Sequence, residues 1–327
     1  MDGPWQICAK TAYEYGRTAN EAAKLMKWVD PSIELVACGS SGYHMPTFGD
    51  WEYQMLTECY ENIDYVSLHR YYGNQTNDTP DFLARNMDLD GFIKTVVSIC
   101  DAVGGKKHSK KKLNLSFDEW NVWYHSHEQD KEVWKMGKWN RALPLLEDVY
   151  NFEDALLVGA MLITFLRNAD RVKVACLAQL VNVIAPIMTR NGGGVWAQTI
   201  YWPMMHASKF GRGEALRAIL KAPKLDTKHG QVDSVASAVT FDEEKGELTV
   251  FALNLANEAA QLSVNARSFE NLSPIEHIVL DGELFACNTF DAPEAILPHN
   301  VATTPCTKGV SDVTLPARSW NVLRYKI

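Results

Sequence analysis

Residues 113–124 read LNLSFDEWNVWY, and this stretch decides how the rest of the chain is interpreted. Its first half alternates apolar and polar side chains, which is typical of a β-strand because successive strand side chains point to opposite faces. Two adjacent carboxylates, Asp118 and Glu119, close the run, and aromatic residues follow them. Strand alternation predicts that only one of the two carboxylates enters any one pocket.

The segments around this strand repeat one order of elements. Apolar runs predict strands at 33–39, 65–69, 113–120 and 172–177, and helical periodicity predicts helices at 18–29, 51–62, 78–103 and 152–166. Strands that alternate with helices indicate βα units and a parallel sheet. Four such units correspond to the second half of a (β/α)8 TIM barrel, in which active sites lie at the carboxyl ends of the strands.

After residue 210 the pattern changes to short alternating segments separated by turn residues. These segments predict strands at 235–241, 248–254, 260–264 and 275–280. Such a series is typical of an antiparallel β-sandwich. The expected fold class is therefore α/β plus all-β, with a partial barrel over residues 1–210 and a C-terminal sandwich over residues 211–327.

Composition excludes several classes of protein. A chain of 327 residues with 46% hydrophobic and 22% charged residues is ordinary globular material. A net charge of −8 disfavours nucleic acid as a partner, and no apolar run approaches the ~18 residues of a membrane span. The seven cysteines lack a Cys-x-x-Cys pair and the start lacks a signal-peptide pattern, so we expect reduced thiols and a cytoplasmic location.

The residues alone leave the chemistry open. A carboxylate among aromatic rings can act as a nucleophile toward the anomeric carbon of a sugar that packs on those rings. The alternative is a buried strand end whose acids cap a helix or pair with arginine. His125 and His127 are alternate residues that would share a face in an extended segment and could bind a metal in a metal-dependent hydrolase, but two histidines in a loop after a strand more often serve as polar lining. The glycines at 192–194 lack phosphate-loop spacing, and we expect neither a metal nor an organic cofactor.

Four motifs in order along the chain resemble glycoside hydrolase family 51, the α-L-arabinofuranosidases. They are MDGPWQI at 1–7, HRYYGN at 69–74, FDEWNVWY at 117–124 and AQLVNVIAP at 178–186. The resemblance continues to the LPARSWNVL segment at 315–323 and so covers the whole chain. It implies a retaining exo-acting enzyme that removes terminal arabinofuranosyl residues from arabinose-containing polysaccharides and oligosaccharides, and a homo-oligomer in the complete protein.

The resemblance also implies roles for individual residues. Glu119 matches the nucleophile and Tyr71 the tyrosine that orients it by a hydrogen bond, so Asp118 is expected to face away and pair with a basic group or backbone amides. The residues expected to line or support the sugar site are Trp5, Trp123, Gln179 and His69. Gln179 lies in an apolar run, where a buried amide without a partner would be costly, and Asn182 is a weaker candidate of the same kind.

In this family the acid/base glutamate ends a Gly-Asn-Glu triplet directly before the Met-Asp-Gly-Pro-Trp motif, and this sequence begins at that Met. We therefore expect the site to be incomplete within these residues. The alternative to an enzyme is a catalytically inactive fragment, or a subunit of a split gene, that keeps a partial sugar-binding site.

Overall fold

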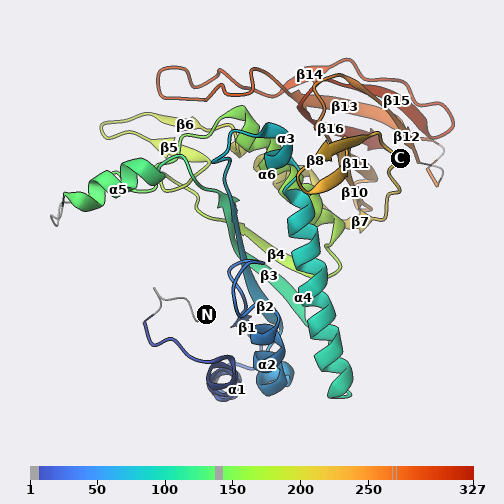
Figure 1. Cartoon of the computed structure of the whole chain (residues 1–327). Helices are drawn as coiled ribbons and strands as arrows, with labels where there is room; N and C mark the ends of the chain where they lie inside the picture. Colours follow the sequence, from blue (N-terminus) through green and yellow to red (C-terminus); the bar gives the residue numbers. More distant parts are fainter. Residues whose placement is uncertain (1–6, 137–142, 267, 270) are drawn as a thin grey trace. The chain divides into compact units, whose positions relative to one another are not determined.

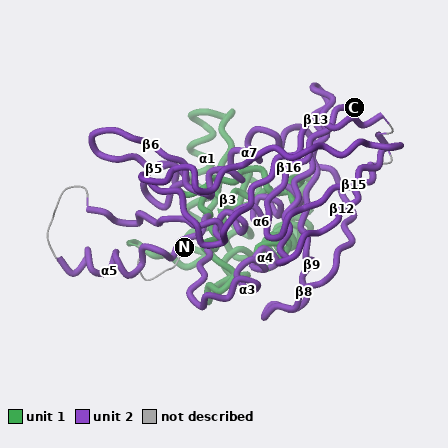
Figure 2. The backbone as a smooth tube through the Cα atoms, turned by 90° about the horizontal axis from the view of Figure 1, so that it is seen from above, with its two compact units in different colours: residues 1–71, 88–120, 168–178 green, residues 72–87, 121–167, 179–327 purple. Residues whose placement is uncertain are grey.

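The computed structural model describes residues 7–136, 143–266, 268–269 and 271–327 (Figure 1). The chain divides into two compact units, coloured separately in Figure 2. Unit 1 comprises residues 1–71, 88–120 and 168–178, and unit 2 comprises residues 72–87, 121–167 and 179–327. Trp5 lies outside the described residues, and the predicted domain boundary at 210/211 stays a prediction.

Unit 1 is built on one sheet. Its strands lie in the order β1-β2-β3-β4, with parallel pairing between β1 and β2 and between β3 and β4. The strands are β1 (Val36–Cys38), β2 (Tyr65–Tyr72), β3 (Asn114–Val122) and β4 (Val172–Leu177), and the helices are α1 (Ala12–Val29), α2 (Asp50–Cys59), the 3-10 helix η1 (Tyr60–Asn62) and most of α4 (Asn86–Lys106). The four predicted strands are present in a mixed α/β unit, as are the helices predicted at 18–29 and 51–62. The single helix predicted over 78–103 is wrong, because two helices occupy residues 79–83 and 86–106. Closure into a barrel stays a prediction.

Local sequence explains how these helices begin and pack. Helix α1 begins after Thr11, whose side chain accepts the N–H of Glu14 while the Glu14 carboxylate accepts the N–H of Thr11. Helix α1 meets α2 closely at Gly16, where a side-chain methyl would lie 2.9 Å from the carbonyl oxygen of Met55. Inside the unit, the rings of Phe92 on α4 and Phe117 on β3 meet edge to face with centroids 6.0 Å apart.

In the part of the chain that the structure describes, unit 2 contains four helices, two hairpins and two further sheets formed by the C-terminal strands. The helices are α3 (Thr79–Leu83), α5 (His127–Lys135), α6 (Phe152–Arg167) and α7 (Tyr201–Phe210). Two hairpins are formed by β5 (Ile187–Thr189) with β6 (Val195–Ala197) and by β8 (Lys224–Thr227) with β9 (Gly230–Asp233). None of the helices in the described ranges is both long and apolar enough to cross a bilayer.

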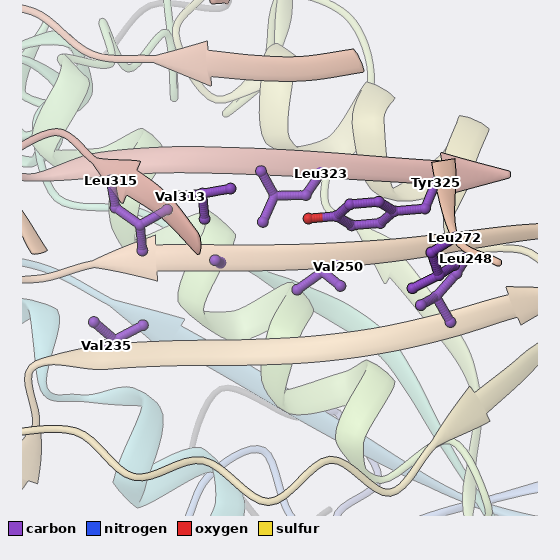
Figure 3. Packing of buried hydrophobic residues seen from close by; sticks show 9 residues of the cluster. Val235, Leu248, Val250, Leu272, Val313, Leu315, Leu323 and Tyr325 are labelled. Atoms are coloured by element: carbon purple, nitrogen blue, oxygen red, sulfur yellow. The ribbon is translucent and has the colours of Figure 1, made fainter. Parts of the chain in front are cut away.

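The C-terminal strands form two sheets. A six-stranded sheet has the order β14-β13-β16-β11-β10-β7, and β12 pairs with β15 in a second sheet. The strands are β7 (Glu214–Leu216), β10 (Val235–Asp242), β11 (Glu247–Asn254), β12 (Ala260–Asn265), β13 (Ser273–Leu280), β14 (His299–Val301), β15 (Val310–Leu315) and β16 (Ser319–Lys326). Buried residues from both sheets share one cluster, including Val250 on β11, Leu323 on β16 and Leu315 on β15 (Figure 3). The two sheets therefore pack face to face, as the predicted sandwich requires.

Helix α6 is packed against this large sheet. It contacts β10, β11 and β16, and a methyl at Gly159 would lie 2.7 Å from the ring of Trp320. The Trp320 Nε1–H donates to His206 Nδ1 on α7 at 3.1 Å. Burial lowers the pKa of His206 to about 4, so its neutral ring is available as an acceptor near neutral pH.

Candidate active site

Two neighbouring strands of unit 1 bring the central residues together. Strand β2 contributes Ser67, His69 and Tyr71, which are alternate residues and therefore share one face of the sheet. Strand β3, the neighbour of β2, contributes Asp118 and Glu119. Four of these five polar side chains occur in the two motifs quoted above at 69–74 and 117–124.

Two side chains contact the same carboxylate oxygen of Glu119. The Tyr71 hydroxyl donates to Glu119 Oε2 at 3.1 Å, and His69 Nδ1 lies 3.4 Å from the same oxygen. Burial and the Glu119 charge raise the pKa of the Tyr71 phenol, so it stays protonated and can donate. The Glu119 side chain is 49% exposed, so a substrate can reach it. The hydrogen bond implied for Tyr71 is present, and the nucleophile role of Glu119 stays a prediction.

Asp118 has partners on strand β2. Its Oδ1 accepts from the Ser67 hydroxyl at 2.7 Å and lies 3.1 Å from His69 Nε2. Burial alone would raise the pKa of Asp118, but the hydrogen bonds from His69 and Ser67 outweigh it and hold that pKa below its ordinary value. Asp118 is therefore ionised at neutral pH and is paired with the His69 imidazole.

Asp118 and Glu119 do not follow strict strand alternation. Between Phe117 and Trp120 strand β3 advances three residues, while its partner β4 advances two, from Ala175 to Leu177. This is a β-bulge, which changes the direction of the side chains beside it. As a result both carboxylates contact the single imidazole of His69. The expectation that Asp118 faces away from the Glu119 site is therefore wrong, because it assumed an unbroken ladder.

The other sugar-site candidates lie in unit 2 or outside the described residues, as Trp5 does. The backbone N–H of Trp123 donates to the Tyr72 carbonyl at 2.8 Å, and its ring meets that of His127 edge to face with centroids 5.0 Å apart. Gln179 is exposed, so the burial expected from its apolar neighbours is wrong. Asn182 is occupied locally: its Nδ2 donates to Thr189 Oγ1 at 2.9 Å and its Oδ1 accepts the Thr189 N–H at 2.7 Å.

His125 and His127 do not form the extended pair considered for a metal. His125 Nε2 lies 2.7 Å from Asp154 Oδ2, whereas His127 is the first residue of α5 and contacts Trp123. The two imidazoles thus have separate partners. Among the residues that the structure describes, no group of three or more histidine, cysteine or acidic side chains is placed to hold a metal ion.

Comparison with known proteins adds to this geometry. Residues 118–319 match the family described as "Alpha-L-arabinofuranosidase C-terminal domain". The chain belongs to this family. Over 327 residues it is 54% identical to the "Intracellular exo-alpha-(1->5)-L-arabinofuranosidase 1" of Bacillus subtilis, which covers 100% of this chain and 65% of that protein. It is 40% identical to the "Exo-alpha-(1->6)-L-arabinofuranosidase" of Bifidobacterium longum, covering 100% of this chain and 64% of that protein.

A solved structure gives the same result. The structure of AbfB, a family 51 α-L-arabinofuranosidase from Bifidobacterium longum, superposes with a TM-score of 0.91 at 35% identity, covering 100% of this chain and 66% of that one. The chain thus spans about two thirds of the length of its relatives: 65% and 64% of the two sequences and 66% of the solved chain.

Two residues that organise the site were not predicted. Ser67 could have been found, because it precedes His69 by the two-residue step that puts strand residues on one face. Asp148 could not, because it lies far along the chain from the segment it holds. Its carboxylate accepts the backbone N–H groups of Tyr124, His125 and Ser126 at 3.0, 3.1 and 2.8 Å, and so fixes the chain just after Trp123.

Proposed function

We propose that this chain carries the nucleophile part of a retaining exo-α-L-arabinofuranosidase. The observation that carries the proposal is an exposed carboxylate, Glu119, held by Tyr71 and His69 at the ends of two adjacent strands. The relatives that share 54% identity are named for α-(1→5)-linked arabinofuranose, so terminal α-(1→5)-linked arabinofuranosyl residues are the proposed substrate. Because those relatives are named intracellular enzymes, an intracellular location is proposed as well.

The proposed reaction has two displacements. A Glu119 oxygen attacks the anomeric carbon, the bond from that carbon to the leaving oxygen breaks, and an acid protonates the leaving oxygen. Water then attacks the arabinosyl ester, a base takes the water proton, and Glu119 is released as a carboxylate. The contacts from Tyr71 and His69 both use Oε2, so they orient the carboxylate and leave Oε1 to attack.

Retention requires a second carboxyl group about 5 Å from the nucleophile. By the family pattern this acid is the glutamate of a Gly-Asn-Glu triplet ahead of Met1, and we propose that the active polypeptide includes it. A polypeptide that restores the triplet and the upstream strands should hydrolyse a nitrophenyl arabinofuranoside at least ~10²- to 10⁴-fold faster than residues 1–327 alone. Equal rates would show that another group supplies the proton.

A mechanism-based label tests the nucleophile directly. A 2-fluoro-arabinofuranosyl reagent with a strongly activated leaving group should form an ester with the nucleophile, because such a leaving group needs little acid assistance. The electron-withdrawing fluorine then slows hydrolysis of that ester, because the transition state resembles an oxocarbenium ion. Peptide mapping of the labelled extended polypeptide should place the sugar on Glu119. An adduct on Asp118 would overturn the assignment, and neither label nor turnover would favour an inactive sugar-binding chain.

A further inference from the structure

A continuous row of polar contacts crosses from β2 to β3 and ends at Glu119. The Ser67 hydroxyl and His69 Nε2 both meet Asp118 Oδ1, at 2.7 and 3.1 Å, and His69 Nδ1 lies 3.4 Å from Glu119 Oε2. An imidazole is planar and rigid, so a partner at each nitrogen determines the direction of its whole ring. The orientation that His69 presents to Glu119 therefore depends on what holds its far nitrogen.

Asp118 is suited to hold that nitrogen. An ionised carboxylate only accepts hydrogen bonds, so the contact with Asp118 requires a proton on His69 Nε2. The Asp118 side chain is 37% exposed, and its hydrogen bond from Ser67 limits its movement. Charge-assisted hydrogen bonds of this type are about twice as strong as neutral ones.

The bulge in β3 allows both acids to contact the same imidazole. Without the extra residue between Phe117 and Trp120, alternation would direct Asp118 to the face opposite Glu119. With it, the two neighbouring acids meet one imidazole. Bulges next to active sites commonly redirect a side chain in this way.

We propose that Asp118 is a positioning residue for the nucleophile: it accepts His69 Nε2–H and so sets the direction of the ring, which points His69 Nδ1–H at Glu119 Oε2. The inference rests on the proposed function of Glu119. Asp118 acts through His69 and does not touch the substrate. Its loss should therefore reduce the rate of the chemical step and leave substrate binding nearly unchanged.

The first test compares variants of the extended polypeptide. Asp118→Ala should slow both kcat and the labelling of Glu119 by about 10²-fold, the cost of a nucleophile displaced by about 1 Å, with KM within about threefold. Asp118→Asn should recover most of this loss, because its side-chain oxygen can still accept from Ser67 and His69. Asp101→Ala is the matched control: it removes another carboxylate of unit 1, bonded to Arg171 at 2.9 Å, and should leave kcat unchanged.

A second measurement does not depend on turnover. In the extended polypeptide labelled with ¹⁵N-histidine, the His69 signals, assigned by their loss in His69→Gln, should show an Nε2–H that is hydrogen-bonded and exchanges slowly with water. Asp118→Ala should remove this hydrogen bond, and Asp118→Asn should keep it. If Asp118→Ala fails to fold, Ser67→Ala is the milder variant and should give a smaller decrease in labelling rate at unchanged KM.

The outcomes separate the two proposals. Failure of the wild-type protein to label at Glu119 would contradict the proposed function. Normal labelling at Glu119 with equal rates in wild type and Asp118→Ala, or unchanged His69 nitrogen signals in that variant, would overturn the positioning role. Loss of activity in Asp118→Asn as large as in Asp118→Ala would show that the charge matters and the ring orientation does not.

Discussion

In each unit, two acids that are adjacent in sequence lie near a histidine, and the two pairs of acids differ in how deeply they are buried. In unit 1, Asp118 and Glu119 contact His69 and Glu119 is 49% exposed. In unit 2, Glu153 and Asp154 open helix α6, His125 contacts Asp154, and the two acids are 1% and 0% exposed. The residue types are nearly the same, and exposure decides which pair can meet a substrate.

The two glutamates also differ in how many of their carboxylate oxygens have partners. Glu153 accepts from Asn74 Nδ2 at 3.0 Å and from the Thr79 hydroxyl, so both of its oxygens are used to hold the chain after β2. Glu119 receives Tyr71 and His69 on one oxygen only. A buried acid with a partner on each oxygen stabilises the fold, whereas an exposed acid contacted on one oxygen leaves the other accessible, as the proposed nucleophile role requires.

The largest expected effect tests this contrast at Glu119. Glu119→Ala in the extended polypeptide should lower kcat by on the order of 10⁴-fold or more, as removal of a nucleophile does. The free energy of unfolding should change little, because the side chain is half exposed. Steady-state kinetics and urea denaturation of the same preparation measure the two quantities, and retained turnover would contradict the assignment.

The matched substitution in unit 2 should lower stability and leave activity unchanged, the reverse of what is expected for Glu119→Ala. Glu153→Ala leaves the buried Asn74 amide and Thr79 hydroxyl without their acceptor, and each buried group left unpaired costs about 1–3 kcal/mol. Urea denaturation should show this loss, and any activity of the folded fraction should remain. Glu153→Gln, which keeps one acceptor oxygen, should be less destabilised; equal stability of all three proteins would refute the structural role.

The histidine of the buried pair should make stability depend on pH. Burial alone would lower the pKa of His125, but the hydrogen bond and charge of Asp154 outweigh it and raise the pKa above its ordinary 6.5. A raised pKa in the folded state adds stability that is fully present below pH 6.5 and lost as pH rises through the folded value.

The measurement is the free energy of unfolding between pH 6 and 9. The wild-type value should fall as pH rises, and His125→Gln should show a flatter dependence. The same slope in wild type and His125→Gln would show that another group is responsible.

The sequence predicted the elements of unit 1 well and the contacts of the site less well. Residues 113–120 have strong alternation, and the strand found there is Asn114–Val122. The bulge at Asp118 depends on the register of β4, which lies far along the chain, so no local pattern indicates it. Helix α5 was missed because residues 127–135 are mostly charged and polar and bury only Asp130 and Val133.

Burial was misjudged where the backbone turns sharply. Residues 177–185 are mainly apolar, which favoured a buried amide at Gln179. The chain instead turns there, with φ of 65° at Asn182 and 38° at Ile184, and Gln179 is exposed. Apolar neighbours predict burial only while the chain stays in a regular strand.

The smallest expected effects are those of substituting Asn182 and Gln179, which should differ in whether stability or turnover changes. Asn182 Nδ2 and Oδ1 both bond to Thr189, so Asn182→Ala should cost about 1 kcal/mol of stability per lost hydrogen bond and leave KM within about twofold. Gln179→Ala should leave stability unchanged, because the side chain is exposed, and should weaken turnover if the amide meets sugar hydroxyls. Thermal unfolding and steady-state kinetics of the two variants in the extended polypeptide provide the comparison. A raised KM in Asn182→Ala with unchanged stability would mean that the Thr189 contact is dispensable and that Asn182, after all, binds the sugar.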